Sequence, residues 1–230
     1  MLVIGHRGAS GYVAENTLES IQKALDLNVD GVEIDVQCCA SGEIVVFHDK
    51  ELDRLTNKKG LIEKTNFDEL STILIKEKYK IPTLEEVLEL LDGQILLNIE
   101  LKGKNTAIAT ASIIEKHIKK TKNDLKKIIV SSMDWDELNI LHNTNKQISI
   151  GILSNAHIML EKNIFHQAKK LNAIAIHPRL SVLNQKIVDK IHNLGLLVYS
   201  WTINEPKHIK KAMGIGVDGI ITDFPDRIMK

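Results

Sequence analysis

Cysteine, net charge and long apolar runs are all scarce in this sequence. Only two of its 230 residues are cysteines, and they are neighbours, Cys38 and Cys39. Adjacent thiols have poor geometry for a stabilising disulfide and lack the spacing of paired metal ligands. We therefore expect two free thiols in a reducing compartment, which favours a cytoplasmic protein.

The charges balance, because lysine and arginine number 30 and aspartate and glutamate also number 30. A balanced chain has no general attraction for nucleic acid or anionic membranes. No apolar run approaches the roughly 18 residues of a membrane span, and the first residues, MLVIG, resemble a strand rather than a targeting signal. We expect no nucleic-acid partner and no integral membrane association, and homo-oligomer formation stays open.

What the sequence does contain is a recurring alternation of two kinds of segment. Short apolar, β-branched runs are separated by longer stretches of helical periodicity. The runs are LVIG, GVEIDV, IVVFH, QILLNIEL, KIIVSSM, ISIGIL, AIAIH, LLVYSW and GIIT. Only QCCASGE joins the second to the third, which is too short for a helical crossover, so we expect these two to pair as a hairpin. Counting them as one unit leaves eight strands alternating with helices, which predicts a TIM (β/α)8 barrel.

The length and composition favour one domain. A chain with 43% hydrophobic residues can bury one sizeable core, so we expect a single domain over residues 1–230. The segment from about 50 to 80 is long, polar and weakly periodic, and it predicts a small insertion after the second β unit.

Acidic residues stand in the predicted strands near the carboxyl ends, where TIM barrels carry their sites. Glu33 and Asp35 are two apart, so both side chains leave on one face and would repel each other unless a cation lies between them. Glu100 can supply a third carboxylate. Oxygen ligands without a thiolate favour one hard divalent cation, Mg²⁺ or Ca²⁺. The alternative is an internal salt-bridge network of Glu33 and Asp35 with Arg7 and Lys102.

Two histidines also follow predicted strands. His6 and His48 have ordinary pKa values near neutrality, which suits one to accept a proton while the other donates one. Arg7 offers a planar fork of donors and Lys102 a point charge, and both suit a phosphate group. These residues indicate metal-assisted, acid/base cleavage of a phosphate ester.

Longer blocks of sequence carry a family resemblance. The blocks are HRGASGYVAENTLESIQKAL, GVEIDVQCCASGEIVVFHDKELDRLT, IPTLEEVLELL with LNIELK, VYSWTINEP and VDGIITDFPD. Together they span essentially the whole chain, which resembles the glycerophosphodiester phosphodiesterase family (glycerophosphoryl diester phosphodiesterases). Two departures are Ala14, where the family usually has proline, and the cysteine pair in a turn that is usually polar and acidic.

The resemblance implies a TIM barrel with a small inserted segment and a metal-dependent hydrolase of glycerol and phospholipid metabolism. The implied substrates are small-molecule glycerophosphodiesters, such as glycerophosphocholine or glycerophosphoethanolamine, and the products are glycerol 3-phosphate and an alcohol. By position, the resemblance implies the acid/base histidines His6 and His48, the metal ligands Glu33, Asp35 and Glu100, and the phosphate contacts Arg7 and Lys102. Trp201 stands where the family has an aromatic residue, and it could line the glycerol pocket or simply pack.

Two other functions stay open at this point. One is phospholipase D-like cleavage of lysophospholipids, for which ILIKEKYKI is a modest candidate for an apolar lip. The other is a non-catalytic phosphodiester-binding module, which the presence of both His6 and His48 argues against. His177 ends the run AIAIH, and we expect it at the edge of the site.

Overall fold

A closed barrel of parallel strands forms the centre of the computed structural model, which describes residues 1–155 and 163–228. Around the barrel the order is β1 (Leu2–His6), β11 (Gly219–Thr222), β10 (Leu197–Ser200), β9 (Ala175–Pro178), β8 (Ser149–Ser154), β7 (Ile128–Ser132), β6 (Leu96–Leu101) and β2 (Gly31–Cys38). Pairing of β1 with β2 closes the ring. The predicted TIM barrel is confirmed.

The predicted hairpin is also present. β3 (Ile44–Val46) pairs with β2 in the antiparallel direction, with Val36 opposite Val46. The chain therefore turns back at the carboxyl end of β2, and the residues after β3 are brought close to the barrel mouth.

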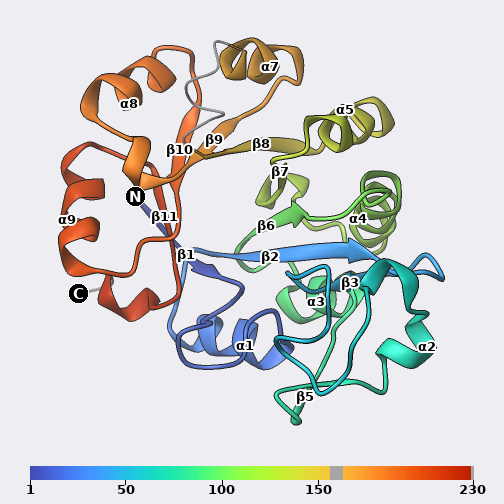
Figure 1. Ribbon diagram of the computed structural model, residues 1–230. Coiled ribbons are helices and arrows are strands. Elements are labelled where there is room, and N and C mark those ends of the chain that lie inside the picture. Colours follow the sequence, from blue (N-terminus) through green and yellow to red (C-terminus); the bar gives the residue numbers. More distant parts are fainter. Residues whose placement is uncertain (156–162, 229–230) are drawn as a thin grey trace.

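Helices cover the outside of the barrel (Figure 1). They are α1 (Leu18–Asp26), α3 (Leu84–Leu91), α4 (Ala107–Thr121), α5 (Trp135–Thr144), α7 (Ile164–Lys170), α8 (Gln185–His192) and α9 (Pro206–Gly214). Several begin at a polar cap: the Thr17 hydroxyl accepts from the Ser20 amide, and Thr83 forms a capping box with Glu86. Such caps satisfy amide groups that the first helical turn leaves without partners. None of the helices in the described part of the chain is long and apolar enough to cross a membrane.

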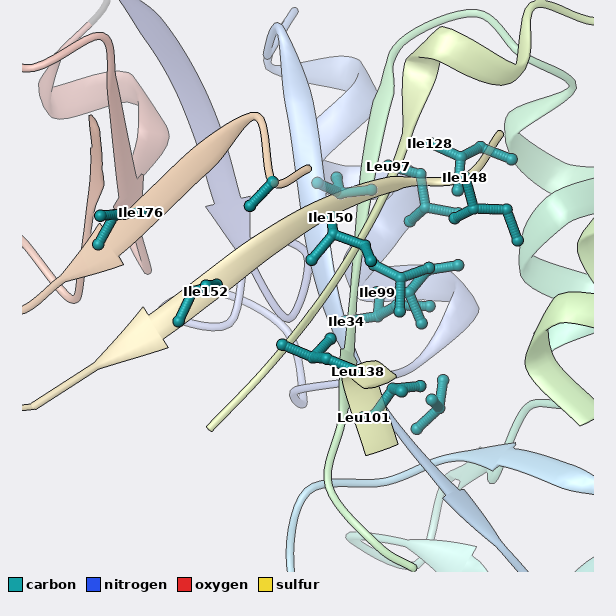
Figure 2. Close-up of a cluster of buried hydrophobic side chains, with 14 of the residues drawn as sticks. Ile34, Leu97, Ile99, Leu101, Ile128, Leu138, Ile148, Ile150, Ile152 and Ile176 are labelled. Carbon is teal, nitrogen blue, oxygen red and sulfur yellow. The ribbon is translucent and has the colours of Figure 1, made fainter. Parts of the chain in front are cut away.

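The main core lies between the strands and this outer layer of helices. Ile34 of β2, Ile99 of β6 and Ile150 of β8 are fully buried or nearly so, and Leu138 of α5 belongs to the same cluster (Figure 2). Burying each side chain of this size contributes about 1.5–3 kcal/mol. Because side chains alternate along a strand, the neighbours of these residues point into the barrel.

A smaller cluster fills the barrel interior. It consists of Ile4, Ile129, Ala175, Tyr199 and Ile221. Each of these residues comes two positions before a polar or aromatic residue at the carboxyl end of its strand and faces the same side. The apolar cluster therefore forms the floor beneath the polar mouth.

The segment between β3 and α3 contains η1 (Ile62–Lys64), α2 (Phe67–Leu70), β4 (Leu74–Ile75) and β5 (Tyr79–Lys80). It lies beside the carboxyl end of β2 (Figure 1). Although its sequence is polar, Ile62, Leu70 and Ile75 are fully buried and form a separate cluster with Phe47. Its weak periodicity follows from the shortness of its elements.

Candidate active site

Strand register brings the predicted site residues together at the barrel mouth. His6 of β1 pairs with Glu33 of β2, and Glu33 pairs with Asn98 of β6. Two residues farther along, Asp35 pairs with Glu100. Residues two apart share a face, so these side chains form two adjacent levels inside the barrel.

The three predicted carboxylates form one buried cluster. Ligand oxygens of Glu33, Asp35 and Glu100 all lie within 4.8 Å of one another. Burial, together with the charges of Asp35 and Glu100, raises the pKa of Glu33 well above its usual value. Burial and the charge of Asp35 raise the pKa of Glu100 to about 7. In setting these pKa values, burial and the repulsion between the carboxylates outweigh the attraction of Arg7 and Lys102.

Two cations accompany the cluster, as the salt-bridge alternative anticipated. Lys102 Nζ donates to Glu100 Oε1 at 3.0 Å. Arg7 Nε lies 3.1 Å from Asp35 Oδ2 but without the angle of a hydrogen bond. Among the described residues, Glu33 Oε1 is buried and has no hydrogen-bond partner. The ion pairs are therefore present but leave one carboxylate oxygen without a partner. The set of carboxylate oxygens fits a metal ion that prefers oxygen ligands.

The loop after β1 is shaped to reach this cluster. Arg7 adopts φ 54°, and its backbone amide donates to Glu33 Oε2 at 3.0 Å. Gly8 follows at φ 84°, and a Cβ there would lie 2.5 Å from Ser20, so only glycine fits. Asn16 at the end of the loop donates to Asp35 Oδ2 at 2.9 Å.

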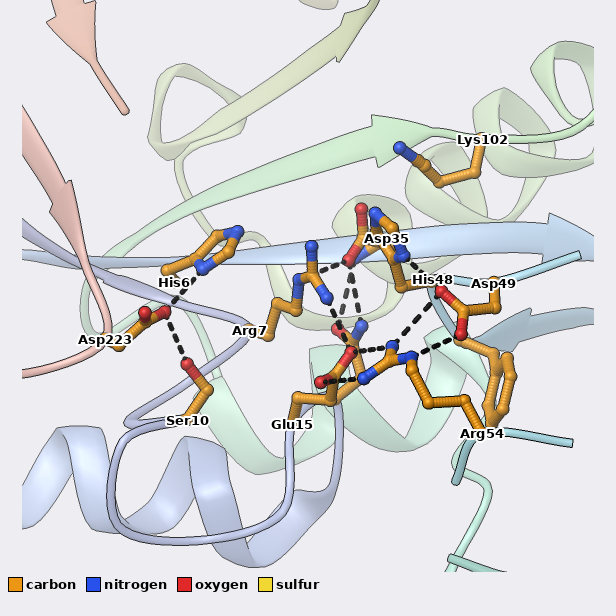
Figure 3. Close-up of polar contacts among 12 residues, drawn as sticks. His6, Arg7, Ser10, Glu15, Asp35, His48, Asp49, Arg54, Lys102 and Asp223 are labelled. Carbon is orange, nitrogen blue, oxygen red and sulfur yellow. Dashed lines mark hydrogen bonds and ion pairs between the residues drawn. The ribbon is translucent and has the colours of Figure 1, made fainter. Parts of the chain in front are cut away.

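His6 is held by a carboxylate from the far end of the chain. Its Nδ1 lies 2.6 Å from Asp223 Oδ1, which also accepts from the Ser10 hydroxyl, as Figure 3 shows. Burial would raise the pKa of Asp223, but the hydrogen bond and charge of His6, with bonds from Ser10 and Asn204, lower it to about 2. The other ring nitrogen, Nε2, lies 4.0 Å from Glu33 Oε2.

His48 has a matching partner in Asp49, whose Oδ1 lies 2.6 Å from His48 Nδ1. Arg54 binds Asp49 and also donates to both carboxylate oxygens of Glu15, at 2.8 and 2.7 Å. Because Glu15 also binds Arg7, one chain of ion pairs joins Arg7 to His48 (Figure 3). Burial lowers the pKa of His48 from its usual value, more than the charge of Asp35 raises it.

These groups open into one cavity of about 310 Å³. It is lined by His6, Arg7, Glu33, His48, Asn98, Glu100, Lys102, Met133, Leu153, His177, Arg179, Trp201, Thr202 and Ile221. Every residue predicted for the site lines it except Asp35, which lies buried beside it.

Trp201 and His177 form part of the far wall. Trp201 Nε1 donates to the backbone oxygen of His177 at 2.6 Å, which fixes the indole. His177 is fully buried, and burial lowers its pKa to about 3, so its ring is neutral at pH 7. Neither of its ring nitrogens has a hydrogen-bond partner within the described residues. His177 is thus deeper than the edge position expected from the sequence.

The sequence did not single out several residues of the site, among them Asp223 and Arg54. Asp223 directly follows the last strand, so the rule that singled out the other strand ends could have found it. Arg54 lies in the polar stretch DKELDRLTNKK, where nothing distinguishes it from its charged neighbours.

The fold and this cavity together define a class of protein. Phosphate esters are cleaved when charge at phosphorus is neutralised and one group accepts a proton while another donates one. A barrel that gathers cations, two carboxylate-paired histidines and an acidic cluster able to hold a metal ion in one cavity is a TIM-barrel hydrolase of phosphate esters.

Comparison with known proteins narrows the class to one family. The chain belongs to the glycerophosphoryl diester phosphodiesterase family, whose model matches residues 6–227. A glycerophosphodiester phosphodiesterase of Caldanaerobacter subterraneus is 33% identical, over 99% of this chain and 96% of that protein. The chain is accordingly a phosphoric diester hydrolase.

Solved structures agree with this assignment. A phosphodiesterase of Oleispira antarctica, in complex with the product sn-glycerol-3-phosphate, is 29% identical with a TM-score of 0.89, covering 100% of this chain and 95% of that one. A glycerophosphodiester phosphodiesterase of Thermotoga maritima is also 29% identical, with a TM-score of 0.83 and coverage of 100% and 97%.

Proposed function

We propose that this enzyme hydrolyses small-molecule glycerophosphodiesters to glycerol 3-phosphate and an alcohol, with His6 and His48 as its proton-transfer groups. The observation that carries the proposal is that both histidines are oriented by carboxylates and line the same cavity as the acidic cluster. The product bound to the Oleispira relative supports glycerol 3-phosphate as the product here. A cytoplasmic location is part of the proposal, and the free thiols of Cys38 and Cys39 suit it.

Glu33, Asp35 and Glu100 would hold one divalent cation, Mg²⁺ or Ca²⁺. The unpartnered Glu33 Oε1 and the raised pKa values of Glu33 and Glu100 support this, because both features disappear when a cation neutralises the cluster. When bound, such a cation supplies Lewis acidity toward a phosphate oxygen.

The side chains of the cavity bind the phosphate and transfer protons. Arg7 and Lys102 bind the phosphate and neutralise the charge that grows as phosphorus becomes pentacoordinate. One histidine accepts a proton from the nucleophile and the other donates one to the departing alcohol. Asp223 and Asp49 bind the Nδ1 atoms, which leaves each Nε2 for proton transfer. Trp201, fixed by its bond to the His177 carbonyl, closes the wall beside the substrate.

The test is release of glycerol 3-phosphate from glycerophosphoglycerol, followed with a coupled dehydrogenase. His6→Ala and His48→Ala should each fold and lose about 10²–10⁴-fold in kcat. His166→Ala, at an exposed position of α7, is the matched control and should keep full activity. Near-normal turnover by both site variants would show that the proposed mechanism is wrong.

A chelator tests the metal separately. Thorough EDTA treatment should abolish turnover, and added Mg²⁺ or Ca²⁺ should restore it. Full activity after chelation would exclude the metal from the reaction.

A further inference from the structure

A second cavity opens beside the first and is basic. It measures about 410 Å³ and is lined by Arg179, Leu180, Ser181, Trp201, Thr202, His208 and Lys211. Three of these residues, Arg179, Trp201 and Thr202, also line the reaction cavity, so the two cavities adjoin at these side chains. A substrate bound at the acidic cluster would enter the second cavity if its leaving group extended past these three side chains. We call this second space the basic annex.

The charge of the annex differs from that of the reaction cavity. Its lining holds two permanent cations, Arg179 and Lys211, and His208, whereas none of these seven described residues is acidic. Within residues 1–155 and 163–228, neither Arg179 nor Lys211 forms an ion pair with a carboxylate. By contrast, Arg7, Arg54 and Lys102 in and around the reaction cavity are all paired. The annex thus presents cations whose charge the described protein does not balance.

The arrangement of Arg179 and Trp201 also disfavours a cationic guest. The Arg179 guanidinium lies 4.8 Å from the centre of the Trp201 ring and already occupies a cation–π position there. A choline or ethanolamine group would meet a like charge on the Trp201 ring of the annex lining. An anion would meet Arg179, Lys211 and the hydroxyls of Ser181 and Thr202.

Lys211 is placed to contribute directly. It lies three residues after His208 on α9, so both side chains share one face of the helix. The Lys211 ammonium makes one described hydrogen bond, to the Leu180 carbonyl at 3.3 Å. An ammonium has three donors, so two stay available for phosphate oxygens.

Resting on the proposed function, we propose that the basic annex binds the leaving alcohol of the substrate and selects alcohols that carry a second phosphate. The preferred substrates are then glycerophosphodiesters with an anionic head group rather than the choline and ethanolamine diesters that the family resemblance suggests. Arg179 and Lys211 are the specificity-determining residues.

Three substrates that differ in head-group charge test the inference on the purified enzyme with added Mg²⁺ or Ca²⁺. Glycerophosphocholine has a cationic leaving alcohol, glycerophosphoglycerol a neutral one, and 1,3-bis(glycerophospho)glycerol one that bears a phosphodiester. Initial rates of glycerol 3-phosphate release give kcat/KM for each. After correction for its two equivalent ends, the bis compound should exceed glycerophosphoglycerol by about tenfold, as expected for one additional charged contact.

Substitutions of Arg179 and Lys211 test whether the basic annex causes the preference for the bis compound. Lys211→Gln should reduce the ratio of the two kcat/KM values severalfold, Lys211→Arg should retain it, and Arg179→Gln combined with Lys211→Gln should bring it close to one. Lys210→Gln removes the same charge from an exposed position of α9 outside the annex, and it should leave the ratio unchanged.

The outcomes are distinguishable. Release from glycerophosphoglycerol without any preference for the bis compound, or a ratio that Lys211→Gln does not change, overturns the inference and leaves the proposed function intact. Absence of release from all three substrates overturns the proposed function and the inference with it.

Discussion

Asp223 is the residue that most changes the view of the site obtained from sequence. It orients His6 through a 2.6 Å contact while Ser10 and Asn204 hold the same carboxyl group. A carboxylate fixed in this way holds the imidazole in one tautomer and one orientation. If His6 transfers protons as proposed, Asp223 acts through it as a positioning residue.

Replacing Asp223 with asparagine tests that role. We expect Asp223→Asn to lower kcat by about 10²-fold or more with little change in KM, because an uncharged amide has one accepting oxygen where the carboxylate has two, so it cannot serve His6, Ser10 and Asn204 as the carboxylate does. Asp226→Asn alters a carboxylate three residues away whose hydrogen bond within the described residues is with the exposed Tyr12 hydroxyl, and its kinetics should match the parent enzyme. Equal kcat values for the two variants would contradict the assignment.

Arg54 shows why some site residues could not be predicted. Its partner Glu15 is 39 residues away in sequence, and the contact arises only because the β2–β3 hairpin returns the chain to the barrel mouth. The residues that strand position identified, such as Glu33 and Glu100, needed no such information. These two carboxylates lie close together because side chains alternate along parallel strands whose carboxyl ends meet at the barrel mouth.

At the scale of elements, strand positions were predictable and packing inside the barrel was not. Each apolar run became a strand, because β-branched residues bounded by polar turns carry a strong strand signal. Sequence alone did not show that Gly151 of β8 makes room for the His177 ring of β9. A Cβ on Gly151 would lie 2.5 Å from His177 Nε2.

This close approach predicts that adding a methyl group at Gly151 destabilises the protein. Gly151→Ala should lower the free energy of unfolding by about 1–3 kcal/mol, because the buried His177 ring has little room to move. Gly214→Ala is the control, since a Cβ there has no neighbour within 4 Å, and its stability should be unchanged or slightly higher. Urea unfolding at pH 7 measures both, and equal midpoints would refute the prediction.

At the scale of the whole molecule, the acidic cluster couples stability to metal and pH. Above its pKa of about 7, Glu100 must be ionised beside Asp35 in the folded protein, whereas in the unfolded chain it ionises freely at lower pH. The metal-free fold is therefore progressively penalised as the pH rises from about 4.5 through 7. A bound divalent cation removes this penalty.

We therefore expect saturating Ca²⁺ or Mg²⁺ to raise the melting temperature by about 5–10 °C at pH 8 and by clearly less at pH 6. Glu100→Gln should lose most of this shift, and Glu115→Gln, at an exposed position of α4, should keep it. Thermal unfolding followed by circular dichroism provides the measurement. A shift that is absent, or larger at pH 6, would contradict metal binding at this cluster.

The pairing of β1 with β11 has a consequence for how the protein is made. Of the strands in the ring, β11 leaves the ribosome last, and Asp223 follows it by one residue. Until that moment His6 has no orienting carboxylate and β1 lacks one of its neighbours. A chain that stops before β11 thus carries nearly all of the proposed catalytic groups, and we expect it to be inactive because β1 lacks a neighbour and His6 lacks Asp223.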